Sequence, residues 1–293
     1  MSDDKKFIKE QKREAKMQRK ALKAQEKKEK KELEEAFMHD RLVDKEIEKD
    51  INYKKRQAYI EKMTPKWEEW KRLNEAPHLS VLEEIGNSVS HGVGAILTIV
   101  ALILLLQKSD TTLKIIASIV YCLAMFFMFF NSCLYHSWKW GKRVKRIWRR
   151  FDYTSIYLMI AGTFAPLQLI EIPRDYGDPQ GFIFGITYFA IMWTLVVVGI
   201  TLTCIFGPGR TKKVNFPLYF IIGWSGLCVV PGWLAHNINL FWWILIGGIV
   251  YTLGMIPFAV LKGKKSAHFI WHLIVMAGVI IQFIGIYLYV YCG

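Results

Sequence analysis

Long apolar runs, separated by short charged breaks, fill the chain from residue 81 onward. A run of about 20 apolar residues is what a helix needs to cross the roughly 30 Å core of a bilayer. Five such runs are bounded by charged residues, at 84–108, 114–139, 151–170, 178–210 and 266–291. Residues 214–261 carry no charge, and their 48 positions suit two spans joined at the polar stretch 235–239. The pattern predicts an all-α membrane protein with a seven-helix bundle.

A polar segment precedes the first apolar run. Residues 1–80 hold 23 Lys+Arg and 18 Asp+Glu, with few large apolar side chains. Lys, Glu, Gln and Ala favour helix through about residue 62, and Pro65 and Pro77 are expected to interrupt it. We therefore divide the chain into a charged helical or disordered extension, 1–80, and a transmembrane domain, 81–293. The extension is expected to be solvated, with anionic lipid or a coiled-coil partner as the alternatives.

The distribution of basic residues predicts how the spans are oriented. The net charge is +14, and in the membrane part the cations gather after spans two, four and six. These three groups are residues 139–150, then Arg210, Lys212 and Lys213, and then Lys262, Lys264 and Lys265. Because cytoplasmic loops carry excess Lys and Arg, we expect a multi-pass plasma-membrane protein with a cytoplasmic N-terminus and an external C-terminus. Topology thus explains the charge, and no nucleic-acid partner is expected.

Four ionisable residues lie at the same end of their spans. They are His136, Asp152, His268 and His272. An ionisable group inside a membrane is costly and calls for a partner or a function. Three of them lie within three residues of Lys139, Arg150 or Lys265, which places them roughly 5 Å from the cytoplasmic border. His272 is one turn deeper and shares a helix face with His268.

These residue types suit a zinc site. A His-x3-His pair with a third His leaves a fourth position open, as in catalytic zinc centres. Asp152 has three candidate roles, as a ligand, as the group that holds an attacking water, or as a partner that orients a histidine. Ser132, four residues before His136, faces the same way and is a candidate donor to a developing oxyanion.

Simpler interpretations stay open for each residue. A single histidine near a span end can be interfacial, and Asp152 can cap a helix or pair with Arg149 or Arg150. His91 is a further candidate, either orienting the site or packing between helices beside Gly92 and Gly94, with direct ligation the less favoured role. His236 is expected to lie in an outer turn.

Four motifs also carry a family resemblance. They occur in the order EEIGNSVSHGVGA (83–95), NSCLYHS (131–137), FDYTSIYLMIAGTFAP (151–166) and HFIWHLIVMAG (268–278). The chain resembles the haemolysin III family, the bacterial branch of the progestin and adiponectin receptor-like proteins, in a wider superfamily with the alkaline ceramidases. The resemblance implies a seven-helix bundle with intramembrane Zn²⁺ held by His136, His268 and His272, with Asp152 and Ser132 beside it.

The chain departs from this family in two positions. Tyr153 and Gln282 stand where many members have histidine, although neither position is an assigned ligand. Three functions follow as hypotheses. The first is a zinc-dependent hydrolase of a membrane lipid amide or ester. The second is a non-catalytic sensor or regulator with structural zinc. The third is a membrane-lytic protein, as the family name suggests, which seven resident spans make the least supported.

Overall fold

The computed structural model describes residues 2–260 and 266–293. The cations Lys262, Lys264 and Lys265 of the sixth loop lie outside the described residues. The chain forms two compact units, Met1–Glu69 and Trp70–Gly293. The second unit contains the membrane bundle together with the short segment that leads into it.

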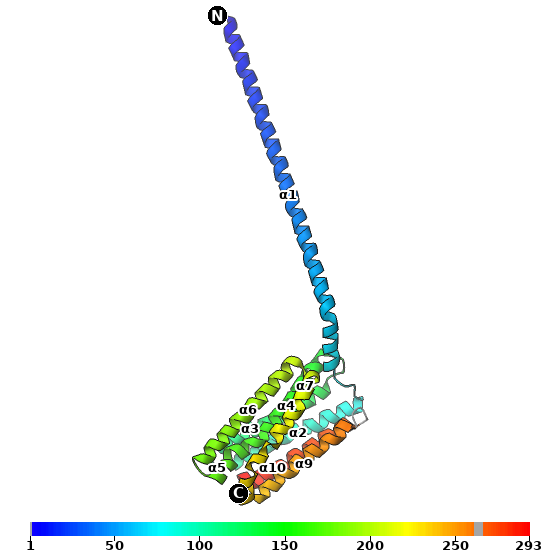
Figure 1. The fold of residues 1–293 in the computed structure, drawn as a ribbon, viewed down its shortest axis with the longest axis vertical. Helices are drawn as coiled ribbons and strands as arrows, with labels where there is room; N and C mark the ends of the chain where they lie inside the picture. The colour runs from blue at the N-terminus through cyan, green and yellow to red at the C-terminus, as the bar shows by residue number, and fades with distance from the viewer. Residues whose placement is uncertain (1, 261–265) are drawn as a thin grey trace. The chain divides into compact units, whose positions relative to one another are not determined.

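Helix α1 runs from Ser2 to Asn74 as one continuous helix, drawn in blue in Figure 1. The expectation that Pro65 interrupts it is wrong, because Pro65 lies inside the helix. Proline removes one backbone hydrogen bond, and water can satisfy the freed carbonyl of an exposed helix. The neighbouring Thr64 Oγ1 also donates to the Ile60 carbonyl at 2.7 Å. Pro77, in contrast, does lie in the break before α2.

Within residues 2–260 and 266–293, seven helical spans follow, as the hydropathy pattern predicted. The first is α2 (Val81–Gln107), the second α3 (Thr112–Ser137), and the third is α4 (Arg143–Pro166) continued by the π-helix η1 (Leu167–Glu171) and by α5 (Ile172–Tyr176). The fourth is α6 (Gln180–Phe206). The fifth consists of α7 (Pro208–Trp224), η2 (Ser225–Val229) and α8 (Val230–His236). The last two are α9 (Ile238–Val260) and α10 (Ala267–Ile286), and the π-helix η3 (Tyr287–Tyr291) continues α10.

Two of the basic groups assigned to loops are helical instead. The cations from Arg143 to Arg150 form the first turns of α4, so the third span begins earlier than the expected residue 151. Arg210, Lys212 and Lys213 likewise lie in the first turns of α7. Lys and Arg are good helix formers, and their long stems reach polar partners at the end of the bundle. The turn in 235–239 is present, since α8 ends at His236 and α9 begins at Ile238.

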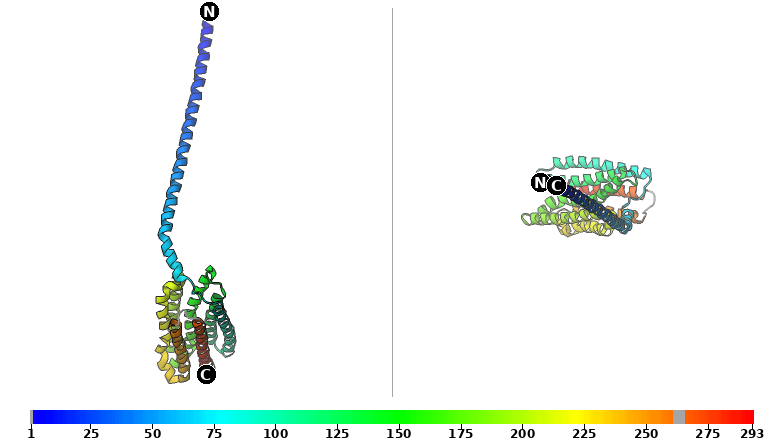
Figure 2. Two further views of the ribbon diagram at one scale, coloured as in Figure 1. Left: turned by 90° about the vertical axis from the view of Figure 1, so that its right-hand side faces the viewer. Right: turned by 90° about the horizontal axis from the view of Figure 1, so that it is seen from above.

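The spans pack side by side into one bundle (Figures 1 and 2). The pairs α2 with α3, α3 with α4 and α9 with α10 make extensive contacts. Glycine permits close approach at these contacts, because a Cβ at Gly162 would lie 2.3 Å from the Ala124 Cβ. Small residues at such contacts let membrane helices approach one another. Outward residues of α2 are apolar, and Ile96, Ile99 and Ile103 are more than half exposed, as suits contact with lipid.

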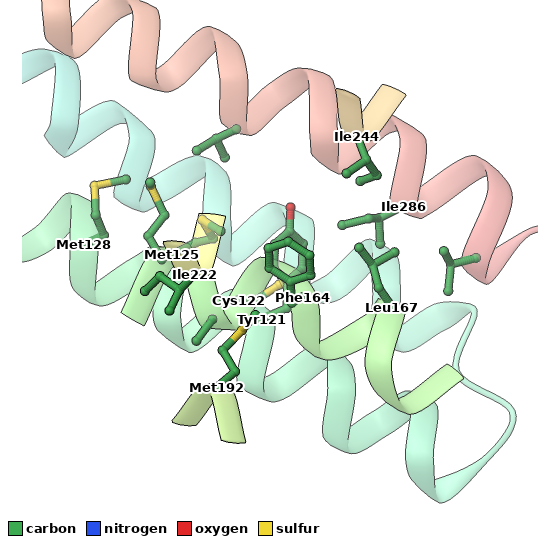
Figure 3. Close-up of a cluster of buried hydrophobic side chains, with 14 of the residues drawn as sticks. Tyr121, Cys122, Met125, Met128, Phe164, Leu167, Met192, Ile222, Ile244 and Ile286 are labelled. Atoms are coloured by element: carbon green, nitrogen blue, oxygen red, sulfur yellow. The ribbon is translucent and has the colours of Figure 1, made fainter. Parts of the chain in front are cut away.

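Figure 3 shows the centre of the bundle, where buried apolar side chains from several spans meet. Tyr121 and Met125 come from α3, Phe164 from α4, Met192 from α6 and Ile222 from α7. All five are less than one-tenth exposed. This packed centre separates two polar clusters, one at each end of the bundle.

The cluster at the α5 end joins three segments that are distant in sequence. Glu171 is fully buried, pairs with Arg174 and accepts a hydrogen bond from Asn237 Nδ2 at 2.7 Å. Arg174 also donates to the Tyr289 carbonyl at 2.8 Å, and Asn237 Nδ2 donates to it at 3.2 Å. The cluster therefore ties the end of the third span to the α8–α9 turn and to η3, which Figure 1 draws at this same end.

Candidate metal centre and cavity

The opposite end of the bundle brings three histidines together. His136 lies in the last turn of α3, and His268 and His272 lie one turn apart at the start of α10. One nitrogen from each ring falls within 4.8 Å of the others, so the three form a candidate metal-binding group. His136 Nε2 and His268 Nε2 are 3.2 Å apart. His136 and His272 are each only 2% exposed.

The geometry of this group fits a zinc ion. With Zn–N bonds of about 2.05 Å and tetrahedral angles, two ligand nitrogens are roughly 3.3 Å apart. The distance between His136 Nε2 and His268 Nε2 already matches this value, and small ring rotations would shorten the longer distances to His272. His272 Nδ1 is buried and has no hydrogen-bond partner within the described part of the chain. Buried imidazole nitrogens with no partner normally bind something.

A carboxylate that the sequence analysis did not assign holds His136 in place. Glu84 Oε2 is 2.7 Å from His136 Nδ1, and Glu84 Oε1 is 2.7 Å from Lys145 Nζ. An Nδ1–H donated to Glu84 leaves the Nε2 lone pair pointing toward the other histidines. Carboxylates commonly orient metal-binding histidines in this way. The signal was the spacing of Glu84, Asn87 and His91, which share one face of α2.

Lys145 explains how three helices meet at this point. Its side chain is 1% exposed, and its ammonium also donates to the carbonyls of Tyr135 at 3.2 Å and Trp138 at 3.0 Å. These carbonyls lie at the C-terminal end of α3, where a cation is favoured. Lys145 on α4 thus closes the end of α3 and pairs with Glu84 on α2. A residue assigned to a basic loop is instead part of the site's frame.

A second local motif positions the start of α10. Ser80 and Glu83 form a capping box at the N-terminus of α2, in which each side chain accepts from the other residue's backbone N–H. Glu83 Oε1 also accepts from the backbone N–H of Ser266, one residue before α10. The sequence that begins α2 therefore also anchors the helix that carries His268 and His272.

Asp152 and Ser132 lie beside the three histidines without joining the ligand group. Asp152 lies within α4, so it does not cap that helix, and it forms no ion pair among the described residues. Arg149 turns instead to the Glu75 carbonyl, at 3.0 Å. Ser132 and Asp152 line the same cavity, and the buried Ser132 Oγ has no hydrogen-bond partner within the described residues.

His91 packs directly on the group. Its ring stacks on His272 with centroids 3.7 Å apart and contacts Phe129 edge-on. It is 3% exposed, and neither ring nitrogen has a hydrogen-bond partner among the residues described. Gly94 permits the approach of Phe129, since a Cβ there would lie 2.6 Å from its ring. His91 is therefore placed to fix the plane of His272, outside the ligand group itself.

A cavity of about 920 Å³ opens beside these residues. His91, Ser132, Asp152, His268 and His272 contribute to its wall, while His136 lies behind it. Most other wall residues are apolar or aromatic, such as Phe164, Trp233 and Tyr251 farther along the bundle. Gln282, one of the two departures from the family pattern, also lines it and donates to the Ile244 carbonyl at 3.2 Å. An apolar cavity with a few convergent polar groups is typical of a small-molecule site.

Comparisons with known proteins agree with the resemblance seen in the motifs. A family model described as "Haemolysin-III related" matches residues 79–283. Hemolysin-3 of Bacillus cereus is 36% identical over 217 residues, which cover 72% of this chain and 93% of that protein. The Hemolysin-3 homolog of Bacillus subtilis (strain 168) is 30% identical, covering 72% and 95%. Monocyte to macrophage differentiation factor of Homo sapiens is 27% identical, covering 71% and 85%.

The matched region contains the whole of the histidine group, most of the cavity wall beside it and most of the candidate spans. The α1 extension before Leu79 falls outside the match. With its apolar spans, the chain is a multi-pass membrane protein, and it belongs to the haemolysin-III-related family.

Proposed function

We propose that the protein is a zinc-dependent hydrolase of a membrane lipid amide or ester, with His136, His268 and His272 as the zinc ligands. The observation that carries the proposal is the cavity, which brings an apolar wall, two of the three ligands, Asp152 and Ser132 together. An acyl chain fits the apolar part, while its amide or ester bond lies against the polar residues. A structural metal alone would need no such cavity.

Each residue of the site has a separate role in the proposed hydrolysis. Zinc, when bound, supplies a Lewis acid that polarises a carbonyl and activates water near pH 7. Asp152 is placed to accept the proton of the attacking water, since it lines the cavity and has no ion-pair partner among the described residues. Ser132 is placed to donate a hydrogen bond to the carbonyl oxygen as negative charge develops. Glu84 keeps the His136 ring oriented.

We further propose that the histidine end of the bundle faces the cytoplasm, in the plasma membrane. Support comes from the cations Lys139, Lys142 and Arg143 and from those at the start of α7, which lie at this end. The α1 extension is then cytoplasmic, and the Glu171 cluster lies at the external face. A site just inside the cytoplasmic leaflet suits a scissile bond close to a lipid headgroup.

The test is metal analysis of the purified protein combined with a lipid-release screen using ceramide-like amides and glycerolipid esters. We expect about one zinc per chain and release of fatty acid. Asp152→Asn should abolish release while keeping zinc, and His272→Ala should lose both. Release that persists in zinc-free His272→Ala protein would refute the zinc-dependent mechanism.

A second candidate, a sensor or regulator with structural zinc, is favoured by where the ligands lie. They come from α3 and α10, and α2 contacts both helices. A bound metal would therefore link α3 directly to α10, and α2 packs against both of these helices. In that case chelation should lower the melting temperature of the bundle, no lipid should be turned over, and deletion of residues 1–62 should abolish regulation while the bundle stays folded.

A further inference from the structure

Helix α1 contains two consecutive segments with opposite charge character. Residues 9–31 hold eleven basic and four acidic residues, whereas residues 32–62 hold seven basic and nine acidic residues. Their net charges are therefore +7 and −2. Every residue from Lys12 to Ile60 has an exposed side chain. The positive charge of the extension is thus confined to its first segment.

Within residues 9–31 the cations follow a single face of the helix. Seven lysines recur every three or four residues, which is the spacing of one helical stripe. They are Lys9, Lys12, Lys16, Lys20, Lys23, Lys27 and Lys30. At 3.6 residues per turn, Glu10, Glu14 and Glu29 fall on the opposite face, and Glu26 falls at the edge of the stripe. We call these seven lysines the lysine stripe.

No lysine of the stripe forms an ion pair with another of the described side chains. Among the described side chains, the ion pairs along α1 begin at Lys28–Glu32 (3.7 Å) and Lys31–Glu35 (3.6 Å), both starting beyond Lys27. In the second segment Lys54 pairs with Asp50 at 2.8 Å. Residues 32–62 therefore neutralise much of their own charge, whereas the stripe presents a concentrated positive field along about 33 Å of helix.

We propose that the lysine stripe docks on the anionic phospholipid surface of the bilayer that holds the seven spans. Charge complementarity selects an anionic surface, and the covalent tether keeps the stripe near this one at high effective concentration. Large apolar residues are sparse in the segment, and Met17 and Leu22, 74% and 63% exposed, lie off the stripe. Docking is therefore electrostatic and superficial, without insertion of an apolar face.

The test uses the full chain reconstituted in vesicles, with hydrogen exchange of residues 9–31 and 32–62 read separately. In vesicles with about 30 mol % phosphatidylglycerol we expect exchange of residues 9–31 to slow at least roughly tenfold relative to pure phosphatidylcholine. Residues 32–62 serve as the internal control and should not change. About 0.5 M salt should reverse the protection by screening.

Two triple variants that lose the same net charge distinguish an effect of the lysine stripe from an effect of net charge. Lys16→Gln, Lys20→Gln and Lys23→Gln together should remove the protection, because they interrupt the stripe. Lys45→Gln, Lys49→Gln and Lys55→Gln remove the same charge from the second segment and should leave it. Glutamine has a helix propensity close to that of lysine, so both variants should keep α1 helical by circular dichroism.

Several outcomes would overturn the proposal. One is the absence of any effect of phosphatidylglycerol, and another is an equal loss of protection in both triple variants. Protection in phosphatidylcholine that grows with protein density would point to a second copy of the chain instead. Protection on adding single-stranded RNA, but not on adding phosphatidylglycerol, would point to nucleic acid.

Discussion

The two polar clusters at the ends of the bundle differ in how completely their atoms are partnered. At the α5 end Glu171 uses both carboxylate oxygens, one with Arg174 and one with Asn237. At the histidine end, within the residues described, Ser132 Oγ, His272 Nδ1 and both nitrogens of His91 are buried without partners. The first cluster therefore resembles a structural clamp, and the second resembles a site that awaits a ligand.

This difference separates stability from function in a protein where both need buried polar groups. A buried charge that is fully hydrogen-bonded holds helices together, while an unpartnered buried group costs free energy that folding alone does not recover. The elements at the α5 end also hold exceptions, since Asp175 Oδ2, Gln168 Oε1 in η1 and Trp233 Nε1 in α8 lack partners among the described residues. His236 Nδ1 lies 3.8 Å from the other oxygen of that carboxylate, Asp175 Oδ1, and the His236 side chain is 58% exposed.

The largest effect should come from Asp152→Asn. We expect lipid hydrolysis to fall about 10²- to 10⁴-fold, because the amide cannot accept the proton of the attacking water. Zinc content should not change, since Asp152 lies outside the ligand group. Release of fatty acid and metal content report the two quantities. Asp175→Asn, a carboxylate changed at the other end, is the control and should leave turnover intact.

Glu171→Ala should affect stability instead. The substitution takes the ion-pair partner from Arg174 and one hydrogen-bond acceptor from Asn237, and leaves both with the Tyr289 carbonyl. Because Arg174 is partly exposed, the free energy of unfolding should fall by about 1–3 kcal/mol. Unfolding in SDS measures this loss, and zinc content per folded chain should not change. If Glu171→Ala also released zinc, the two clusters would be coupled, and the division between clamp and site would be wrong.

Glu84→Gln should weaken zinc binding by about 10- to 100-fold, because the neutral amide orients His136 less firmly and leaves Lys145 without its counter-charge. Competition with a chelator measures the affinity, and unfolding of the zinc-free protein measures any structural damage. Glu75→Gln is the matched control, since Glu75 pairs with Arg146 away from the histidines. Equal affinities for the two variants would show that Glu84 only fills space.

The smallest effect is expected for His236→Gln. Its contact with Asp175 is long and the side chain is more than half exposed, so the loss should stay below about 1 kcal/mol. The same substitution at His272 should abolish zinc binding. Thermal melts with and without zinc compare the two histidines directly. A large loss at His236 would mean that the α5 end contains more than the Glu171 clamp.

The sequence predicted the spans and the meeting of the histidines because both depend on local or nearly local rules. Hydropathy over about 20 residues defines a span, and i, i+4 spacing places His268 and His272 on one face. The third histidine could be added because loop charges put the end of α3 and the start of α10 at one level. The expected depth of each histidine in the membrane was therefore enough to group the three, without knowledge of how the helices pack.

The partners of these histidines could not be predicted in the same way. Lys145 was assigned to a basic loop, because charge pattern alone does not distinguish a solvated lysine from one that closes a neighbouring helix. Glu84 was used as a span boundary, although it lies inside α2 and contacts His136. Both roles depend on how α2, α3 and α4 cross. The continuation of α1 through Pro65 was missed for a different reason, since exposure lowers the cost of one lost hydrogen bond.

The close contact of Gly162 with Ala124 is a point about which α3 and α4 can tilt relative to each other. Asp152 lies ten residues from this contact along α4, roughly 15 Å, and His136 lies twelve residues from it along α3, roughly 18 Å. A relative tilt of only about 4° would change their separation by about 1 Å, a displacement that can cost about 100-fold in rate. Bilayer thickness and lateral pressure act on helix tilt. By tilting α3 and α4 about this contact, they would set the distance between Asp152 and His136.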